Sequence, residues 1–145
     1  MSEQNTTLVH RAITEVWNKG NYDVLSELVA QDIVIHSSTP SEDIHGPEGI
    51  KQFYSVLRMA FPDLHFTVED QIAHGDRVVT RWTARGTHAG EFQGIPPTGK
   101  QVTMSGIDID RIVNGKVVEC WPIADDLNVM QQLGVLSAPD QEQPR

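Results

Sequence analysis

Apolar and polar positions alternate along this chain with two different periods. In residues 5–18 the apolar positions fall three and four residues apart, which predicts an amphipathic helix. Residues 24–29 carry a second apolar face and predict a shorter helix that packs against the first. A third helix is expected to begin at Pro47, which suits a first helical turn, and to end before Pro62. One short β-branched strand, at residues 32–36, interrupts this helical half.

After Pro62 the apolar period changes from about 3.6 to about 2, which predicts strands. Asn114-Gly115 is the dipeptide typical of a two-residue hairpin, so neighbouring strands are expected to be antiparallel. A last short helix is expected from Leu127 to Gly134. Helices first and strands second indicate an α+β fold, in which the helices cover the concave face of a curved antiparallel sheet and can enclose a cavity. The expected strands are residues 64–68, 78–84, 102–112 and 117–123.

Length and charge narrow the function classes. A chain of 145 residues is expected to form a single domain, residues 1–145, with a folded core at 5–134 and a mobile polar tail at 137–145. Acidic residues number 20 against 11 Lys and Arg, and the basic residues are scattered. This charge pattern disfavours nucleic acid and anionic membrane as partners.

The chain shows neither a signal peptide nor an apolar run of ~18 residues, so a soluble, cytoplasmic protein is expected. Cys120 is the only cysteine, which excludes an intramolecular disulfide and a thiolate cluster. No two histidines have the helical i, i+4 spacing of a zinc site, and no metal is expected.

Two carboxylates, Asp125 and Asp126, stand where the last strand gives way to the last helix. Aspartate suits a helix N-cap. Apolar neighbours such as Trp121 and Ile123 could instead raise a carboxyl pKa toward neutrality, by up to ~3–5 units, as proton transfer requires. We expect Asp125 to be the acid/base group and Asp126 to be the cap or a solvated carboxylate.

Three further polar side chains are candidates for a site. His36, at a strand end, titrates near pH ~6.5 and could partner a carboxylate, although such a histidine is also often structural. Arg81 lies in an apolar strand and needs either a ligand in the cavity or an ion-pair partner on the opposite face. His88 precedes a glycine- and proline-containing loop and could contact a substrate.

Aromatic residues at strand and helix spacings serve as core and can also form pocket walls. We expect Trp17, Phe53 and Trp121, together with His88, to contact a bound substrate, and Trp82 to add aromatic bulk.

Several segments, in the same order along residues 8–134, resemble those of the SnoaL-like polyketide cyclases. They are FPD at 61–63, RWT at 81–83, GTHAGEFQGIPPTGK at 86–100, GIDI at 106–109, NGKVVECW at 114–121, Asp125, and QQLG at 131–134. The resemblance implies the cone-shaped α+β barrel of the nuclear transport factor two superfamily, a homodimer formed through the sheet, and a pocket between helices and concave sheet. It also implies that Asp125 is the acid/base of an intramolecular aldol ring closure, without metal or organic cofactor.

The chain departs from that family's pattern in one strand. The family has a histidine on the strand before its catalytic aspartate, whereas residues 102–112 offer Asp108, Asp110 and Arg111 instead.

Three hypotheses follow. The first is a cofactor-independent cyclase or isomerase acting on a small hydrophobic carbonyl compound, with Asp125 assisted by His36 or Arg81. The second is an epoxide hydrolase in which Asp108, Arg81 and Asp125 activate water. The third is a dimer that binds a small hydrophobic molecule without catalysis.

Overall fold

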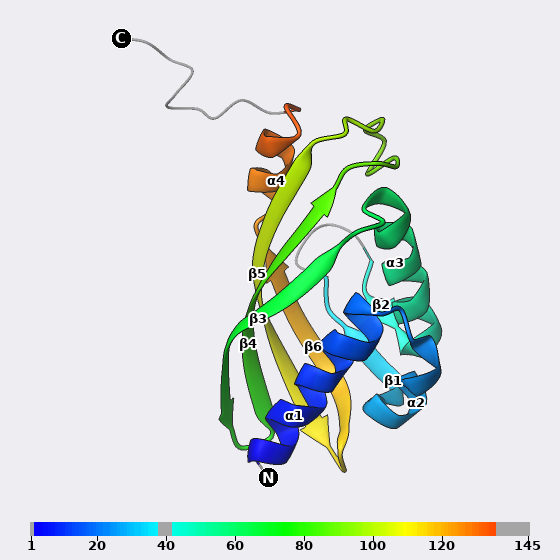
Figure 1. Ribbon diagram of the computed structural model, residues 1–145. Helices are drawn as coiled ribbons and strands as arrows, with labels where there is room; N and C mark the ends of the chain where they lie inside the picture. Colours follow the sequence, from blue (N-terminus) through cyan, green and yellow to red (C-terminus); the bar gives the residue numbers. More distant parts are fainter. Residues whose placement is uncertain (1, 38–41, 136–145) are drawn as a thin grey trace.

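The helices of the first 60 residues lie on one side of a curved six-stranded sheet in the computed structural model, which describes residues 2–37 and 42–135, and the last helix lies beside an end of that sheet (Figure 1). This arrangement confirms the predicted α+β class. The elements are α1 (Ser2–Ala12), the π-helix η1 (Ile13–Asn18), the 3₁₀ turn η2 (Tyr22–Val24), α2 (Leu25–Leu28), β1 (Val29–Ile35), β2 (Ile44–His45), α3 (Gly46–Ala60), β3 (His65–His74), β4 (Arg77–Thr87), β5 (Gln101–Val113), β6 (Lys116–Ala124) and α4 (Asp126–Gln132).

The sheet has the strand order β2-β1-β6-β5-β4-β3. Strands β3 to β6 form the predicted antiparallel meander. Strand β1 differs, because it runs parallel to β6. The sheet is therefore mixed, and since β2 and β3 are its two edges it curves without closing into a barrel.

Two helical segments differ from the sequence prediction. The first helix widens into a π-helix at Ile13, and the second is reduced to a 3₁₀ turn followed by one turn of α-helix.

Helix α3 begins at Gly46, whose φ of 72° suits glycine, and has Pro47 in its first turn as expected. The predicted mobile tail at 137–145 lies outside the described residues.

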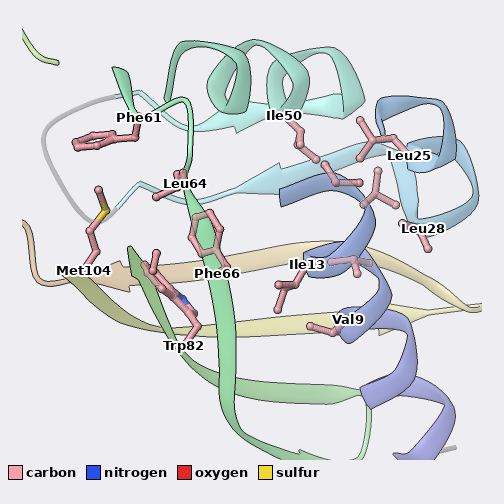
Figure 2. Close-up of a cluster of buried hydrophobic side chains, with 14 of the residues drawn as sticks. Val9, Ile13, Leu25, Leu28, Ile50, Phe61, Leu64, Phe66, Trp82 and Met104 are labelled. Carbon is pink, nitrogen blue, oxygen red and sulfur yellow. The ribbon is translucent and has the colours of Figure 1, made fainter. Parts of the chain in front are cut away.

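The core lies between the helices and the concave face of the sheet (Figure 2). Val9 and Ile13 enter it from the first helical segment, and Phe66 and Trp82 enter it from adjacent strands. None of the helices in the described residues is long and apolar enough to cross a membrane.

Alternation along β4 separates the two faces of the sheet. Val78, Thr80, Trp82 and Ala84 are buried on the concave side, and Arg81 between them is exposed on the convex side. Side chains on the concave side can meet the helices, whereas those on the convex side cannot.

Candidate functional site

Two carboxyl groups lie on the concave face of β5. Asp108 and Asp110 are 3% and 8% exposed, and they are the only buried charged residues in the described part of the chain apart from His88. They follow Val102 and Met104 in the same phase of the strand, so they face the helices. We call Asp108 and Asp110 the carboxyl pair.

The environment of the carboxyl pair raises the pKa of both groups toward neutrality. Burial raises the pKa of Asp108 to about 6, although the hydrogen bond from Trp82 acts in the opposite direction. Burial, and after it the charge of Asp108, raise the pKa of Asp110 to about 7, against a hydrogen bond from the Cys120 thiol. Such values allow both proton uptake and proton release at neutral pH.

Each member of the carboxyl pair has its own neighbour. The indole Nε1 of Trp82 donates a hydrogen bond to Oδ1 of Asp108 at 3.1 Å. Asp110 lies opposite Cys120 on β6. Burial, and then the charges of Asp108 and Cys120, hold the pKa of Tyr54 well above its usual value, so this phenol on α3 stays protonated beside the pair.

An aromatic cluster of Trp17, Tyr54, Phe66 and Trp82 adjoins the carboxyl pair. Trp17 stacks on Tyr54 with ring centroids 5.5 Å apart, and its edge meets Phe66 at 4.9 Å. Trp82 contacts Trp17 at 6.2 Å and Phe66 at 5.3 Å. Apolar rings around a carboxyl group exclude water, which is the physical cause of the raised pKa values.

The π-helix places Trp17 in this cluster. Asn18 hydrogen-bonds the backbone of Phe66 in both directions, donating to its carbonyl at 3.0 Å and accepting from its N–H at 2.7 Å. Arg58 donates to the carbonyl of Trp17. Single π-turns inside helices are often found at functional sites, and here the wider turn is held to both β3 and α3.

Asp125 is the N-cap of α4. Its carboxylate is exposed and accepts a hydrogen bond from the backbone N–H of Asn128 at 3.1 Å. Asp126 is the first helical residue. Of the two roles expected for Asp126, the cap belongs to Asp125, because the chain turns into the helix one residue earlier than expected, and Asp126 is an exposed carboxylate.

Arg81 points away from the carboxyl pair. Its side chain is exposed on the convex face and forms an ion pair with Asp70 at 2.8 Å. Of the two orientations that the sequence allowed, the structure has the ion-pair one. The three-residue epoxide site was wrong, since Asp108 faces the helices while Arg81 and Asp125 are exposed.

His36 lies at the end of β1 beside Trp121. Its Nε2 is 2.7 Å from Glu119 Oε2, and its ring stacks on Trp121 with centroids 5.3 Å apart. The hydrogen bond to Glu119 raises the pKa of His36 above its usual value, and burial acts against it. Trp121 shares the convex face with Glu119, opposite the buried Cys120, so these two predicted site residues meet outside the concave interior.

The remaining predicted contacts are dispersed. His88 is fully buried, and its Nδ1 accepts from the backbone N–H of Thr98 at 3.2 Å. Phe53 on α3 is half-exposed and meets Tyr54 edge to face. Trp17 alone of the four predicted substrate contacts lies in the aromatic cluster.

Two hollows open on the surface of the described residues, one beside Arg111 and Glu119 and the other beside His10 and Gln71. Neither is lined by Asp108 or Asp110, so the enclosed cavity expected from the sequence is not among them. Within residues 2–37 and 42–135 no three His, Cys, Asp or Glu side chains converge as metal ligands would.

From the sequence, Asp108 was a candidate only within the epoxide-hydrolase hypothesis, and Asp110 stood out only as a departure from the family's strand pattern. The strand phase was a partial signal, since both aspartates share the phase of Val102, Met104 and Ile112, but Ile107 and Ile109 make the opposite phase apolar as well.

Comparisons with known proteins agree on one family. The model of the SnoaL-like polyketide cyclase matches residues 7–133. The aklanonic acid methyl ester cyclase DnrD of Streptomyces peucetius is 27% identical over 128 residues, which cover 86% of this chain and 87% of that protein. The nogalonic acid methyl ester cyclase of Streptomyces nogalater is 28% identical over 126 residues, covering 84% and 92%.

Solved structures of several proteins have a similar fold. Wild-type IdmH from Streptomyces antibioticus is 36% identical, with a TM-score of 0.79 over 91% of this chain and 99% of that chain. TsrD from Streptomyces laurentii is 25% identical, with a TM-score of 0.83 over 94% and 98%. The chain belongs to the SnoaL-like polyketide cyclase family.

Proposed function

We propose that this protein is a ring-closing enzyme that works by acid/base chemistry on a small hydrophobic carbonyl compound, with Asp108 and Asp110 as its proton-transfer groups. The observation that carries the proposal is a pair of buried carboxyls with pKa values of about 6 and about 7 beside an aromatic cluster. Relatives named for aklanonic and nogalonic acid methyl esters make a polyketide acid methyl ester the first substrate class to test.

The carboxyl pair supplies what an aldol ring closure requires. An ionised carboxyl removes a proton from the carbon next to a carbonyl, and the resulting enolate carbon forms a C–C bond to a second carbonyl carbon of the same molecule. The alkoxide then takes a proton from the protonated carboxyl, so substrate and product are isomers. Proton transfer between the two carboxyls restores the starting state, and we propose that no metal or organic cofactor takes part.

Two observations favour the carboxyl pair over Asp125, the carboxylate that the sequence favoured. Asp125 is exposed to water and its carboxylate already accepts a hydrogen bond as a helix cap. Proton transfer from carbon is favoured in a site that excludes water, and the exposed surroundings of Asp125 do not exclude it. The competing proposal is that Asp125 is the acid/base group and that His36 is its partner.

A bound substrate needs space beside the carboxyl pair. The rings of Trp17, Tyr54 and Phe66 pack against one another there, so a ligand must turn them aside or separate α3 from the sheet. The alternative functions are binding of a guest without reaction and a purely structural role, because closely packed rings are compatible with both.

Turnover of aklanonic acid methyl ester by wild-type protein and by Asp108→Asn and Asp110→Asn tests the proposal. Product would be followed by chromatography with mass detection, which separates isomers of equal mass, and binding by quenching of tryptophan fluorescence. We expect each variant to bind but to lose about 100-fold or more in kcat. Wild-type turnover in both variants would overturn the assignment, and binding without any wild-type turnover would favour the non-catalytic alternative.

We also propose that the protein is a homodimer formed through the convex face of the sheet. Ile107 and Ile123 are directly opposite each other on β5 and β6, and both are exposed on this face. Exposed apolar patches on sheets commonly mark protein interfaces.

Sedimentation analysis tests the dimer with a matched pair of variants. Ile123 on the sheet and Val56 on α3 are each 64% exposed, so a lysine at either position has similar access to solvent. We expect Ile123→Lys to be monomeric and Val56→Lys to sediment as the wild type does. A monomeric wild type, or a dimeric Ile123→Lys variant, would contradict this interface.

A further inference from the structure

The indole of Trp82 packs against a position on the neighbouring strand that has no side chain. Trp82 on β4 and Gly106 on β5 are directly opposite each other in the antiparallel register. A Cβ atom at Gly106 would stand 2.7 Å from Cε2 of Trp82, closer still to Cζ2, and 2.7 Å from the carbonyl oxygen of Ile123. Such distances are shorter than any real Cβ contact, so the indole can occupy this position only because residue 106 is glycine.

This position carries the indole N–H to Asp108, two residues beyond Gly106 on the same face of β5. Nε1 donates to Oδ1 of Asp108 at 3.1 Å. An indole nitrogen is a donor only, so the carboxyl oxygen must accept, and a hydrogen bond of this kind favours the ionised form.

Asp110 has a weaker donor. It lies opposite Cys120, whose thiol is a poor hydrogen-bond donor, and it stands close to Asp108 on its own strand. The titratable groups that face the carboxyl pair from the other elements are Cys120 on β6 and Tyr54 on α3, and both are neutral at pH 7 because burial raises the pKa of each. Among the described residues no Lys, Arg or His contributes to the titration of Asp108 or Asp110.

We propose that Trp82, held against Gly106, is a positioning residue that divides the work of the carboxyl pair, so that Asp108 is the proton acceptor and Asp110 is the proton donor. The inference rests on the acid/base function proposed above. In the ring closure, the Asp108 carboxylate takes the proton from carbon, and the Asp110 O–H gives its proton to the alkoxide. Asp108 then returns its proton to Asp110, so the protein ends each cycle in the protonation state in which it began.

A titration of the aspartate side-chain carboxyl carbons by ¹³C NMR tests the inference without substrate. Signals of Asp108 and Asp110 would be assigned from the two Asn variants. We expect Asp108 to ionise before Asp110 in the wild-type protein. In Trp82→Phe, which keeps a ring over Gly106 but removes the N–H, we expect the Asp108 pKa to rise by about one unit or more and this order to be lost.

Trp17→Phe is the matched control. It makes the same chemical change in the same aromatic cluster, and Trp17 has no hydrogen bond to Asp108 among the described contacts. We expect it to leave the ionisation order of the carboxyl pair as in the wild type. Gly106→Ala, which forces the indole to move, should reproduce the effect of Trp82→Phe if the variant folds.

The outcome separates this inference from the proposed function. An unchanged Asp108 titration in Trp82→Phe, or an equal shift in Trp17→Phe, would overturn the positioning role even if Asp108→Asn abolishes turnover. A shift confined to Trp82→Phe supports that role even if turnover fails to depend on Asp108, in which case only the proposed function is lost. With an active enzyme, the acidic limb of the rate profile should also move to higher pH in Trp82→Phe.

Discussion

Replacing Asp110 by Asn is expected to stabilise the protein at alkaline pH. In the unfolded chain this carboxyl has its ordinary pKa of 3.8, and in the folded protein burial raises the pKa to about 7. Between these two values the folded state binds more protons than the unfolded state, so the free energy of unfolding falls as the pH rises. Below pH 3.8 the carboxyl is protonated in both states and does not change the free energy of unfolding. Above pH 7 it is ionised in both states, and the cost of ionising it in the folded protein lowers the free energy of unfolding by its full amount.

The two pKa values fix the size of this cost. The difference is about 7 minus 3.8, or about 3 units, and each unit corresponds to about 1.4 kcal/mol, which gives about 4 kcal/mol at pH 8. An asparagine amide carries no proton in this range. Asp110→Asn should therefore match the wild type near pH 4 and exceed it by up to about 4 kcal/mol near pH 8.

Urea unfolding followed by tryptophan fluorescence, repeated at several pH values, measures this difference. Asp63→Asn is the control of opposite sign, because the backbone N–H and then the hydroxyl of Thr87 lower the pKa of Asp63. That pair contributes stability above the unfolded pKa and loses it as the pH falls, so Asp63→Asn should be less stable than wild type near neutral pH. An Asp110→Asn variant whose stability follows the wild-type pH dependence would show that burial does not raise the pKa of Asp110.

Two further predictions concern the residues that the sequence placed in the site. Asp125→Ala should lower the free energy of unfolding by about 1 kcal/mol, measured in urea, because the N–H of Asn128 loses its cap, while Asp125→Ser should keep most of that stability. Glu119→Gln should lower the His36 pKa in a proton NMR titration, because the hydrogen bond to Glu119 is the largest cause that raises it. The stability from this contact is present below pH 6.5 and is lost as the pH rises through the folded pKa, so an unchanged His36 titration would contradict the contact.

Long periodic segments gave most of the fold from the sequence alone. The four later strands and α3 have clear periods and turn residues at their ends, and each is present. The bounds of β5 and β6 are within one residue of the expected ones, whereas β3 continues six residues beyond its expected end at residue 68. The parallel pairing of β1 with β6 could not be predicted, because it joins distant parts of the chain without a turn between them. The π-helix at Ile13 was also missed, since its apolar spacing resembles that of an α-helix.

The site was harder to predict because β5 is apolar in both phases. Ile107 and Ile109 alternate with Asp108 and Asp110, so the sequence alone does not show which set faces the helices. The contact between Trp82 and Asp108 depends on the register of two strands, which no local pattern contains. The sequence favoured Asp125 as the acid/base group because apolar residues are its neighbours along the chain. In the folded protein it is exposed at the start of α4.

The most direct test of the account compares kcat/KM for Asp108→Asn and Asp125→Asn with aklanonic acid methyl ester as substrate. Both substitutions replace one carboxylate by an amide of the same shape, one inside the fold and one at the surface. The account predicts that Asp108→Asn loses about 100-fold or more and that Asp125→Asn retains wild-type activity. Full activity in Asp108→Asn together with a large loss in Asp125→Asn would contradict it and would return the catalytic role to the carboxylate at the start of α4.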